Sequence, residues 1–178
     1  MCSYRDWVIS DAHLEHPAIP KFRDLVTSVD DNTEQIVHHW RALVEPDDTV
    51  ICDGDMAWNI RGLRILQTLP GRKVLVPGNH DFQTDVTVDE LARTYVKFID
   101  ALKNFPGGIW FSHFPMHPQE LRGKINVHGH MHRDAIQDPR YVNVNVDFTG
   151  MKPVLLDDIK SGKYTTYDKV PYEAERHR

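Results

Sequence analysis

The chain has 178 residues, of which 40% are hydrophobic and 26% are charged, and these proportions are ordinary for a soluble globular protein. This length fits one domain, so we expect a single domain over residues 1–178, with 160–178 as a polar, peripheral tail. The formal net charge of −5 gives no indication of the basic surface of a general nucleic-acid-binding protein.

The cysteines and the N-terminal segment argue against two further classes. Cys2 is terminal and Cys52 lies in an apolar run, so we expect no disulfide framework, and a reducing, cytoplasmic setting fits. Residues 1–7 are polar and lack the apolar core of a signal peptide, and no apolar run approaches transmembrane length. We therefore expect a cytoplasmic protein without a membrane partner.

The first half of the chain alternates short apolar runs with segments of helical periodicity. The apolar runs predict buried strands at residues 7–10, 49–52 and 73–76. Amphipathic helices are expected between them, at 32–44 and 60–69. Asp31, with Glu34 three positions later, is interpreted as the N-cap and capping box of the first helix. Alternating strands and helices predict an α/β sheet.

Shorter elements are expected in the second half. Strands are predicted at 109–111, 124–127 and 141–146, where period-two alternation in the last segment indicates one buried face. Residues 95–104 resemble a strand but are ambiguous. Short helical segments are predicted at 21–26, 88–91 and within 153–159.

Polar clusters follow five of these apolar runs, and histidine dominates them. The richest cluster is 128–132, which holds three histidines, and the others are Asp11-Ala12-His13, Gly54-Asp55, Gly78-Asn79-His80-Asp81 and Ser112-His113. Ligands gather at the C-terminal ends of strands in α/β folds. Because clustered imidazoles repel one another when protonated and need partners when neutral, a bound metal is the interpretation that accounts for them together.

The candidate ligands form a mixed oxygen and nitrogen set of carboxylates, an amide and imidazoles. They are Asp11, Asp55, Asn79, His13, His113, His130 and His132. This set suits manganese, iron or zinc better than calcium or magnesium alone, and the absence of thiolates argues against a structural zinc site. Seven ligands are too many for one ion and fit two divalent ions that share one carboxylate.

The order of these motifs resembles the calcineurin-like metallophosphoesterase superfamily, and in particular its small, stand-alone bacterial and phage members. The pattern Asp-x-His, Gly-Asp, Gly-Asn-His-Asp, His and Gly-His-x-His is matched from Asp11 to His132. The resemblance implies a four-layer α/β/β/α sandwich of two mixed β-sheets flanked by helices, with the site at the C-terminal ends of the central strands. The residues themselves indicate only an α/β domain.

The resemblance also implies a role for each motif residue. Two divalent ions, Mn²⁺ foremost and Fe²⁺ or Zn²⁺ as alternatives, would be bridged by Asp55. Asp11, His13 and His132 would complete the first ion's ligands, and Asn79, His113 and His130 the second's. His80 would protonate the leaving oxygen or stabilise charge on the transferring group, and Asp81 would orient its loop.

The implied reaction is hydrolysis of a small or cyclic phosphodiester by a metal-bridged hydroxide. A phosphomonoesterase or nucleotidase is the alternative, and a nuclease or a metal-binding scaffold is less favoured. Protein phosphatases carry Gly-Asp-x-x-Asp-Arg-Gly at the second motif, whereas Trp58 and Asn59 stand here in place of the second aspartate and the arginine. We expect a small phosphorylated substrate, and the sequence leaves the oligomeric state open.

Several further side chains leave more than one interpretation open. His16 is a substrate contact or a solvated loop residue, and His117 is a phosphate contact or a surface residue. His128 is a substrate contact, a support for a neighbouring ligand or a packing residue. The helical His38 and His39 are interpreted as structural or exposed. Trp58 is expected to pack beside the site. The scattered basic pairs are interpreted as solvated surface; they are Lys21/Arg23, Arg61/Arg64 and Arg72/Lys73.

Overall fold

The computed structural model describes residues 4–82, 85–98 and 102–168. The part of the predicted tail beyond residue 168, and residues 99–101 of the ambiguous segment, lie outside that description. The described chain forms two mixed sheets flanked by helices, so the predicted α/β class and its two sheets are confirmed. No helix in these three ranges is long and apolar enough to cross a membrane.

The first sheet is formed by the three strands predicted in the first half of the chain, a short strand in the ambiguous 95–104 segment and a late returning strand. Its order is β4-β3-β2-β1-β9. The members are β1 (Asp6–Ile9), β2 (Thr49–Cys52), β3 (Arg72–Leu75), β4 (Lys97–Phe98) and β9 (Val154–Leu155). The first four are parallel, and β9 is antiparallel to β1. Parallel pairing brings the loops after β1, β2 and β3 to one edge of the sheet.

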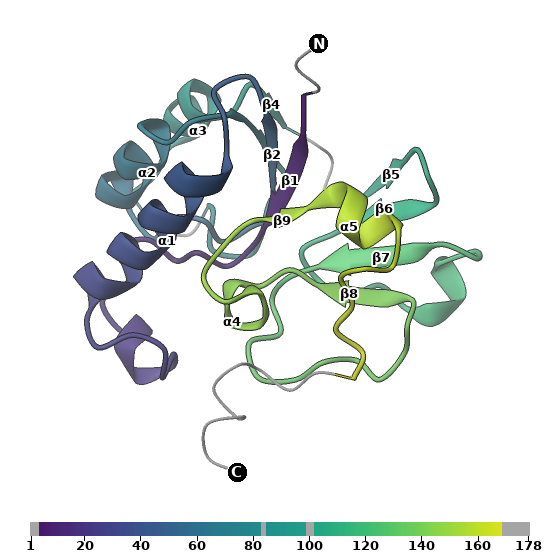
Figure 1. Cartoon of the computed structure of the whole chain (residues 1–178). Helices are drawn as coiled ribbons and strands as arrows, with labels where there is room; N and C mark the ends of the chain where they lie inside the picture. The colour runs from purple at the N-terminus through teal and green to yellow at the C-terminus, as the bar shows by residue number, and fades with distance from the viewer. Residues whose placement is uncertain (1–3, 83–84, 99–101, 169–178) are drawn as a thin grey trace.

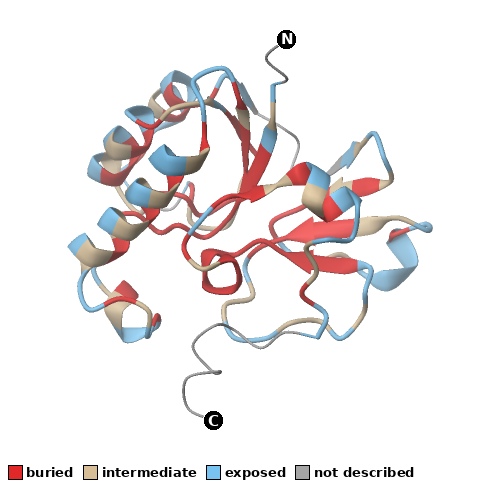
Figure 2. Ribbon diagram, viewed as in Figure 1, coloured by how far each residue is buried: buried red, intermediate tan, exposed pale blue. Residues whose placement is uncertain are grey.

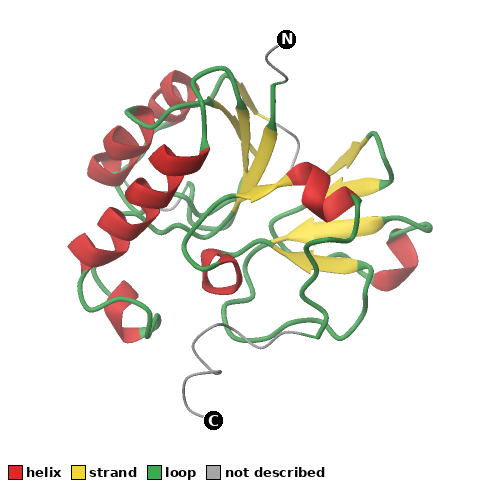
Figure 3. Ribbon diagram, viewed as in Figure 1, coloured by secondary structure: helices red, strands yellow, loops and turns green. Residues whose placement is uncertain are grey.

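Three helices cover the outer face of this sheet, as Figure 3 shows. They are α1 (Val29–Leu43), α2 (Ile60–Gln67) and α3 (Val88–Thr94). Ser28 caps α1 by accepting from Asp31 N, so the helix begins earlier than predicted and the predicted N-cap at Asp31 is wrong. The Asp31 carboxylate instead accepts from Thr27, which fixes the chain entering the helix.

The second sheet has the order β5-β6-β7-β8 (Figure 1). Its strands are β5 (Lys103–Phe105), β6 (Ile109–Phe111), β7 (Ile125–His128) and β8 (Tyr141–Asn143). Strands β6, β7 and β8 are parallel, and β5 is antiparallel to β6. The remaining helical segments are short: η1 (Ile19–Lys21), η2 (Pro118–Glu120), α4 (Val146–Thr149) and α5 (Leu156–Lys160).

Strand alternation divides the core into two clusters, visible as the buried strands of Figure 2. In β1, Trp7 and Ile9 pack toward the helices, whereas Val8 packs with the strands of the second sheet. Both faces of β1 are therefore buried, as its continuous apolar run predicts.

Three local predictions need correction. Residues 141–146 do not form one strand with a single buried face: β8 ends at Asn143, the whole segment is buried, and α4 begins at Val146. The helical turn predicted at 21–26 lies earlier, over Ile19–Lys21. Part of the predicted peripheral tail packs onto β8, since Thr166 accepts from Asn143 N and Tyr164 donates to Asn143 O.

Candidate metal centre

Backbone hydrogen bonds join the motif loops at the C-terminal ends of the strands. Asp11 N donates to Gly54 O and His13 N to Asp55 O, each at 3.0 Å, which joins the loops after β1 and β2. In the second sheet, Gly129 N donates to His113 O at 3.1 Å. An isolated parallel bridge between Ser10 and Asn145 joins the two sheets beside these loops. Ligands far apart in the sequence therefore meet at one edge.

Four of the predicted ligands have left-handed backbone conformations. Their φ angles are 57° at Asp11, 45° at His13, 54° at Asp55 and 63° at His130. Such angles are uncommon for residues other than glycine and cost free energy, so they persist only where the surrounding structure imposes them. The surrounding loops therefore impose uncommon backbone angles on these four predicted ligands.

Two motif glycines are required because the loops approach each other closely. A Cβ at Gly54, where φ is +86°, would lie 2.5 Å from His113 Nδ1. A Cβ at Gly129 would lie 2.0 Å from Ser10 Oγ. Any larger residue would push the ligand loops of the two sheets apart.

The first ligand cluster consists of Asp11, His13 and His132, whose ligand atoms lie within 4.8 Å of one another. Asp11 Oδ2 accepts from Ser10 Oγ at 2.6 Å and from His130 N at 2.9 Å, so it is already occupied. Asp11 Oδ1 faces the imidazoles instead, 3.8 Å from His13 Nε2 and 3.4 Å from His132 Nε2.

The second ligand cluster consists of Asp11, Asp55 and His113, also within 4.8 Å. Asp55 Oδ1 accepts from His80 N at 2.8 Å, and Asp55 Oδ2 lies 3.2 Å from His113 Nε2. His113 Nδ1 lies 2.7 Å from Asp53 O, a carbonyl that can only accept, so this nitrogen carries a proton and the ring, when neutral, presents its lone pair at Nε2. Asp11 belongs to both clusters, whereas Asp55 was predicted as the shared carboxylate.

Three buried atoms without hydrogen bonds belong to predicted ligands and fit a cation. Among the described residues, Asp11 Oδ1, Asn79 Oδ1 and His113 Nε2 are buried and have no hydrogen-bond partner. Each is an electron-pair donor on a predicted ligand. A buried acceptor without a donor is costly, and a cation placed among these atoms would satisfy them. The residues present therefore fit divalent metal ions.

The electrostatics of the centre also favour positive charge. Burial acts to raise the pKa of Asp11, but the adjacent imidazoles of His13 and His132 hold it well below its ordinary value. Burial acts to lower the pKa of His113, but Asp55 and Asp11 raise it to about 10. Burial likewise opposes the rise at His132, where Asp11 and Asp147 raise the pKa to about 9. In the metal-free chain, protons thus take the place of a cation.

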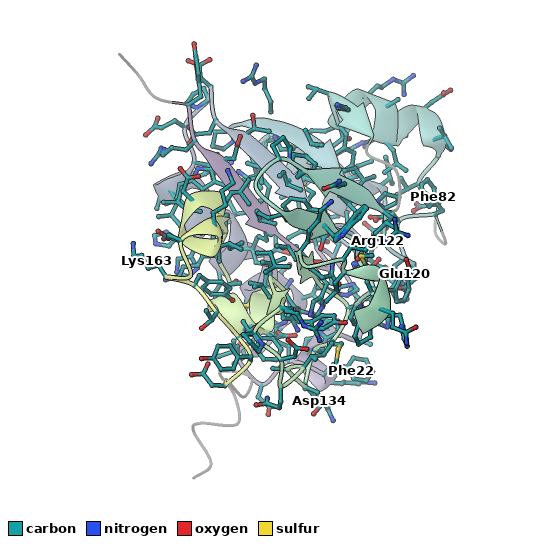
Figure 4. All side chains as sticks on the ribbon, turned by 90° about the vertical axis from the view of Figure 1, so that its right-hand side faces the viewer. Phe22, Phe82, Glu120, Arg122, Asp134 and Lys163 are labelled. Carbon is teal, nitrogen blue, oxygen red and sulfur yellow. The ribbon has the colours of Figure 1, made fainter. Side chains whose placement is uncertain are left out.

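A pocket of about 640 Å³ opens beside the first ligand cluster. Four predicted metal or catalytic histidines line it: His13, His80, His130 and His132. The other lining residues are His16, Ile19, Phe22, Arg133 and Asp134. Figure 4 labels two of these lining residues, Phe22 and Asp134, which lie close to each other near the bottom of its view. The pocket thus joins imidazoles to an apolar wall at Ile19 and Phe22 and to the exposed guanidinium of Arg133.

Aromatic packing holds two of the pocket histidines. The ring of His16 lies 4.0 Å from that of Trp58, and the ring of His80 lies 5.4 Å from it, so Trp58 packs beside the site as predicted. His16 Nδ1 accepts from Ala18 N. Burial and the nearby His13 lower the pKa of His16 to about 4, which keeps this ring neutral near pH 7. His80 Nδ1 has no hydrogen-bond partner among the described residues.

This pocket's lining also leaves out Asp81, His128 and His117. Asp81 is buried, and its Oδ2 accepts from Gly78 N and Asp55 N, so it orients the loop as predicted and is not placed for direct catalysis. His128 is 0% exposed, so it cannot contact a substrate, and the substrate-binding assignment is wrong. His117 caps η2 and lines a separate pocket with Trp110 and Met116, which disagrees with a phosphate contact.

Two basic residues predicted as solvated surface are buried instead. Arg23 is 0% exposed, and its guanidinium pairs with Asp147. Lys73 is 4% exposed, and its Nζ donates to Leu69 O and Gly71 O. Neither Arg23 nor Asp147 has a signal in the local sequence, because they are distant along the chain and Asp147 follows the misassigned alternating segment.

Comparison with known proteins agrees with this geometry. The sequence model of the calcineurin-like phosphoesterase family matches residues 4–168. The chain belongs to the calcineurin-like phosphoesterase family. It is accordingly a hydrolase of phosphoesters that depends on divalent metals, and the predicted family is confirmed.

Relatives of this calcineurin-like phosphoesterase come from phages and from a bacterium. The Gene 66 proteins of Mycobacterium phages L5 and D29 are each 29% identical to it, over 81% and 79% of this chain and 87% of their own lengths. The crystal structure of the protein of unknown function AQ665 from Aquifex aeolicus matches with a TM-score of 0.70 and 26% identity, covering 89% of this chain and 99% of that one.

Proposed function

We propose that this protein is a phosphodiesterase that hydrolyses small or cyclic phosphodiesters with two bound Mn²⁺ ions. The observation that carries the proposal is the pair of ligand clusters sharing Asp11, whose unpartnered ligand atoms lie beside a pocket lined by His80. Two ions held there supply Lewis-acid activation of water and of the phosphoryl oxygens. The chain's own residues supply the remaining requirements.

The residues that line the pocket suit a diester better than a monoester. A diester carries a second organic group and only one negative charge on the phosphate. The wall formed by Ile19 and Phe22 can hold that organic group, because the Phe22 ring is 54% exposed. The Arg133 guanidinium, on the same pocket, can pair with the phosphate. The net charge of −5 agrees with a small substrate rather than a nucleic acid.

We assign the proton transfer to His80. It lies on the loop after β3, and its backbone N–H donates to Asp55 Oδ1 at 2.8 Å, which ties it to the second ligand cluster. Its ring lies 5.6 Å from that of His13 on the pocket wall. From this position the ring can protonate the leaving oxygen of the ester.

The deciding experiment compares turnover of bis-p-nitrophenyl phosphate with that of p-nitrophenyl phosphate. The protein is first stripped of metal, and Mn²⁺, Fe²⁺ or Zn²⁺ is then added back. Metal-dependent preference for the diester, strongest with Mn²⁺, supports the proposal. Preference for the monoester would replace it with a phosphomonoesterase, and no turnover of either ester despite two bound ions would overturn it.

A further inference from the structure

Arg23 is a fully buried guanidinium directly beneath the first ligand cluster. It is 0% exposed, and each of its three nitrogens has a partner. Nε donates to Asp147 Oδ1, one terminal nitrogen donates to Asn32 Oδ1, and the other donates to Asp11 O at 2.9 Å. Because an arginine is almost never buried without strong pairing, this site is built to hold a positive charge.

Asp147 links Arg23 to the predicted ligand His132. Its carboxylate, 1% exposed, accepts from Arg23 on Oδ1, and its Oδ2 lies 2.6 Å from His132 Nδ1. An ionised carboxylate only accepts, so Nδ1 of His132 carries the proton. When the ring is neutral, its lone pair is therefore on Nε2, which faces Asp11 Oδ1 at 3.4 Å. The contact with Asp147 therefore fixes both the tautomer and the direction of the imidazole.

The same network holds the other two ligands of the cluster through their backbone. Arg23 holds the carbonyl of Asp11, and Asn32 Nδ2 donates to Ala12 O at 3.1 Å, between Asp11 and His13. Asn32 lies in α1 and Asp147 in α4. One buried guanidinium thus links the loop after β1, a helix on the first sheet and the segment after the second sheet.

We propose that Arg23 and Asp147 are positioning residues for the first metal ion: Asp147 holds His132 Nε2 as a ligand atom, and Arg23 holds Asp147 and the Asp11 loop in place. This inference rests on the proposed two-metal function. The proposed role concerns the first ion only, because His113 of the second cluster is oriented by a backbone carbonyl, Asp53 O, rather than by a carboxylate.

The test measures Co²⁺ binding to the full chain by its visible absorption and by calorimetry. Asp147→Asn should weaken the first ion's affinity by roughly 10–100-fold and change its absorption spectrum, while the second ion binds as in wild type. The same variant leaves Arg23 without its carboxylate, so it should also unfold at a lower temperature.

A double variant and a matched control separate positioning from stability. Arg23→Gln with Asp147→Asn removes both buried charges, and it should recover thermal stability while the first ion stays weakly bound. Asp48→Asn makes the same charge change at a buried aspartate that accepts from Trp7 Nε1 and pairs with Arg5, at the opposite end of β2. It should lower stability and leave both ions unaffected.

Three results would overturn the inference, and they distinguish failure of the positioning role from failure of the two-metal function. Wild-type affinity and spectrum in Asp147→Asn, or an equal loss of affinity in Asp48→Asn, would refute the positioning role alone. A wild-type chain that binds no Co²⁺ or Mn²⁺ would refute the two-metal function, and this inference with it.

Discussion

The two ligand clusters share Asp11 but are supported in different ways. The first is held by side chains: His132 bonds to Asp147, which pairs with the buried Arg23. The second is held by backbone: His113 Nδ1 donates to Asp53 O, and Asp55 accepts from His80 N. Side-chain support can be lost in one substitution, whereas backbone support is lost only when the loops themselves move. The clusters should therefore fail under different changes.

The largest effect is expected at the shared carboxylate. Asp11 supplies an atom to both clusters, so Asp11→Asn should abolish binding of both ions and reduce turnover to background. Asp55→Asn should chiefly empty the second cluster. Metal content per chain, measured by atomic emission after dialysis, distinguishes the two. Loss of both ions in Asp55→Asn, with one retained in Asp11→Asn, would instead give Asp55 the bridging role.

A substitution at His80 tests whether turnover can be lost while both clusters still bind their ions. Its ring lines the pocket, and its bond to Asp55 uses only its backbone N–H. His80→Ala should keep both ions and lose turnover on the order of 10²–10⁴-fold. Steady-state kinetics beside metal analysis provides the check. Unchanged turnover at full metal content would remove His80 from the reaction.

Gly54 tests the backbone support of the second cluster. Its φ of +86° is unfavourable for alanine, and the added Cβ would lie 2.5 Å from His113 Nδ1. Gly54→Ala should cost about 1–2 kcal/mol of stability from the backbone conformation alone and weaken the second ion more than the first. Gly162→Ala is the control, since φ there is +72° with no atom within 4 Å of the added Cβ. Equal metal affinity in both variants would contradict this view.

The smallest expected effect is a pH dependence of stability, which arises from one histidine in each cluster. The pKa is raised to about 10 at His113 and to about 9 at His132, from an ordinary 6.5. A raised pKa adds stability that is complete below about 6.5 and is lost as the pH rises through 9 and 10. The melting temperature of metal-free protein should therefore fall between pH 7 and 10.

The same two histidines should make metal affinity rise with pH, whereas the stability of the metal-free protein falls. At pH 8 both rings are protonated before an ion binds, so Mn²⁺ must displace protons and its affinity should rise with pH. Calorimetry in two buffers of different ionisation enthalpy counts the released protons. A binding heat that does not depend on the buffer would show that these rings are neutral.

The sequence predicts the strands well where an apolar run is buried on both faces. The runs that became β1, β2, β3, β6 and β7 are found within one or two residues of their predicted positions. The error at 141–146 arises because alternation of Val with Asn normally indicates a half-exposed strand. Here Asn143 and Asn145 are fully buried and bond within the turn into α4, which period-two patterning does not encode.

The motif residues were predictable and their supports were not. The spacing of histidines, aspartates and glycines predicts the candidate ligands because metal chemistry restricts residue type. Arg23 and Asp147 come together only in the folded chain. In the sequence, nothing around Arg23 distinguishes it from a surface arginine, although it is fully buried. Likewise the burial of His128, which removed it from the substrate side, depends on how the second sheet packs.

Ligands drawn from both sheets have a consequence for how the molecule folds and unfolds. Asp11 and Asp55 follow strands of the first sheet, whereas His113 and His132 follow strands of the second, so neither sheet alone can hold the ions. The complete centre can therefore form only after the two sheets have docked. An ion at a hundredfold excess over its Kd would then add about 2.7 kcal/mol to the folded state. Chelators should accelerate unfolding by releasing a clamp between the two sheets.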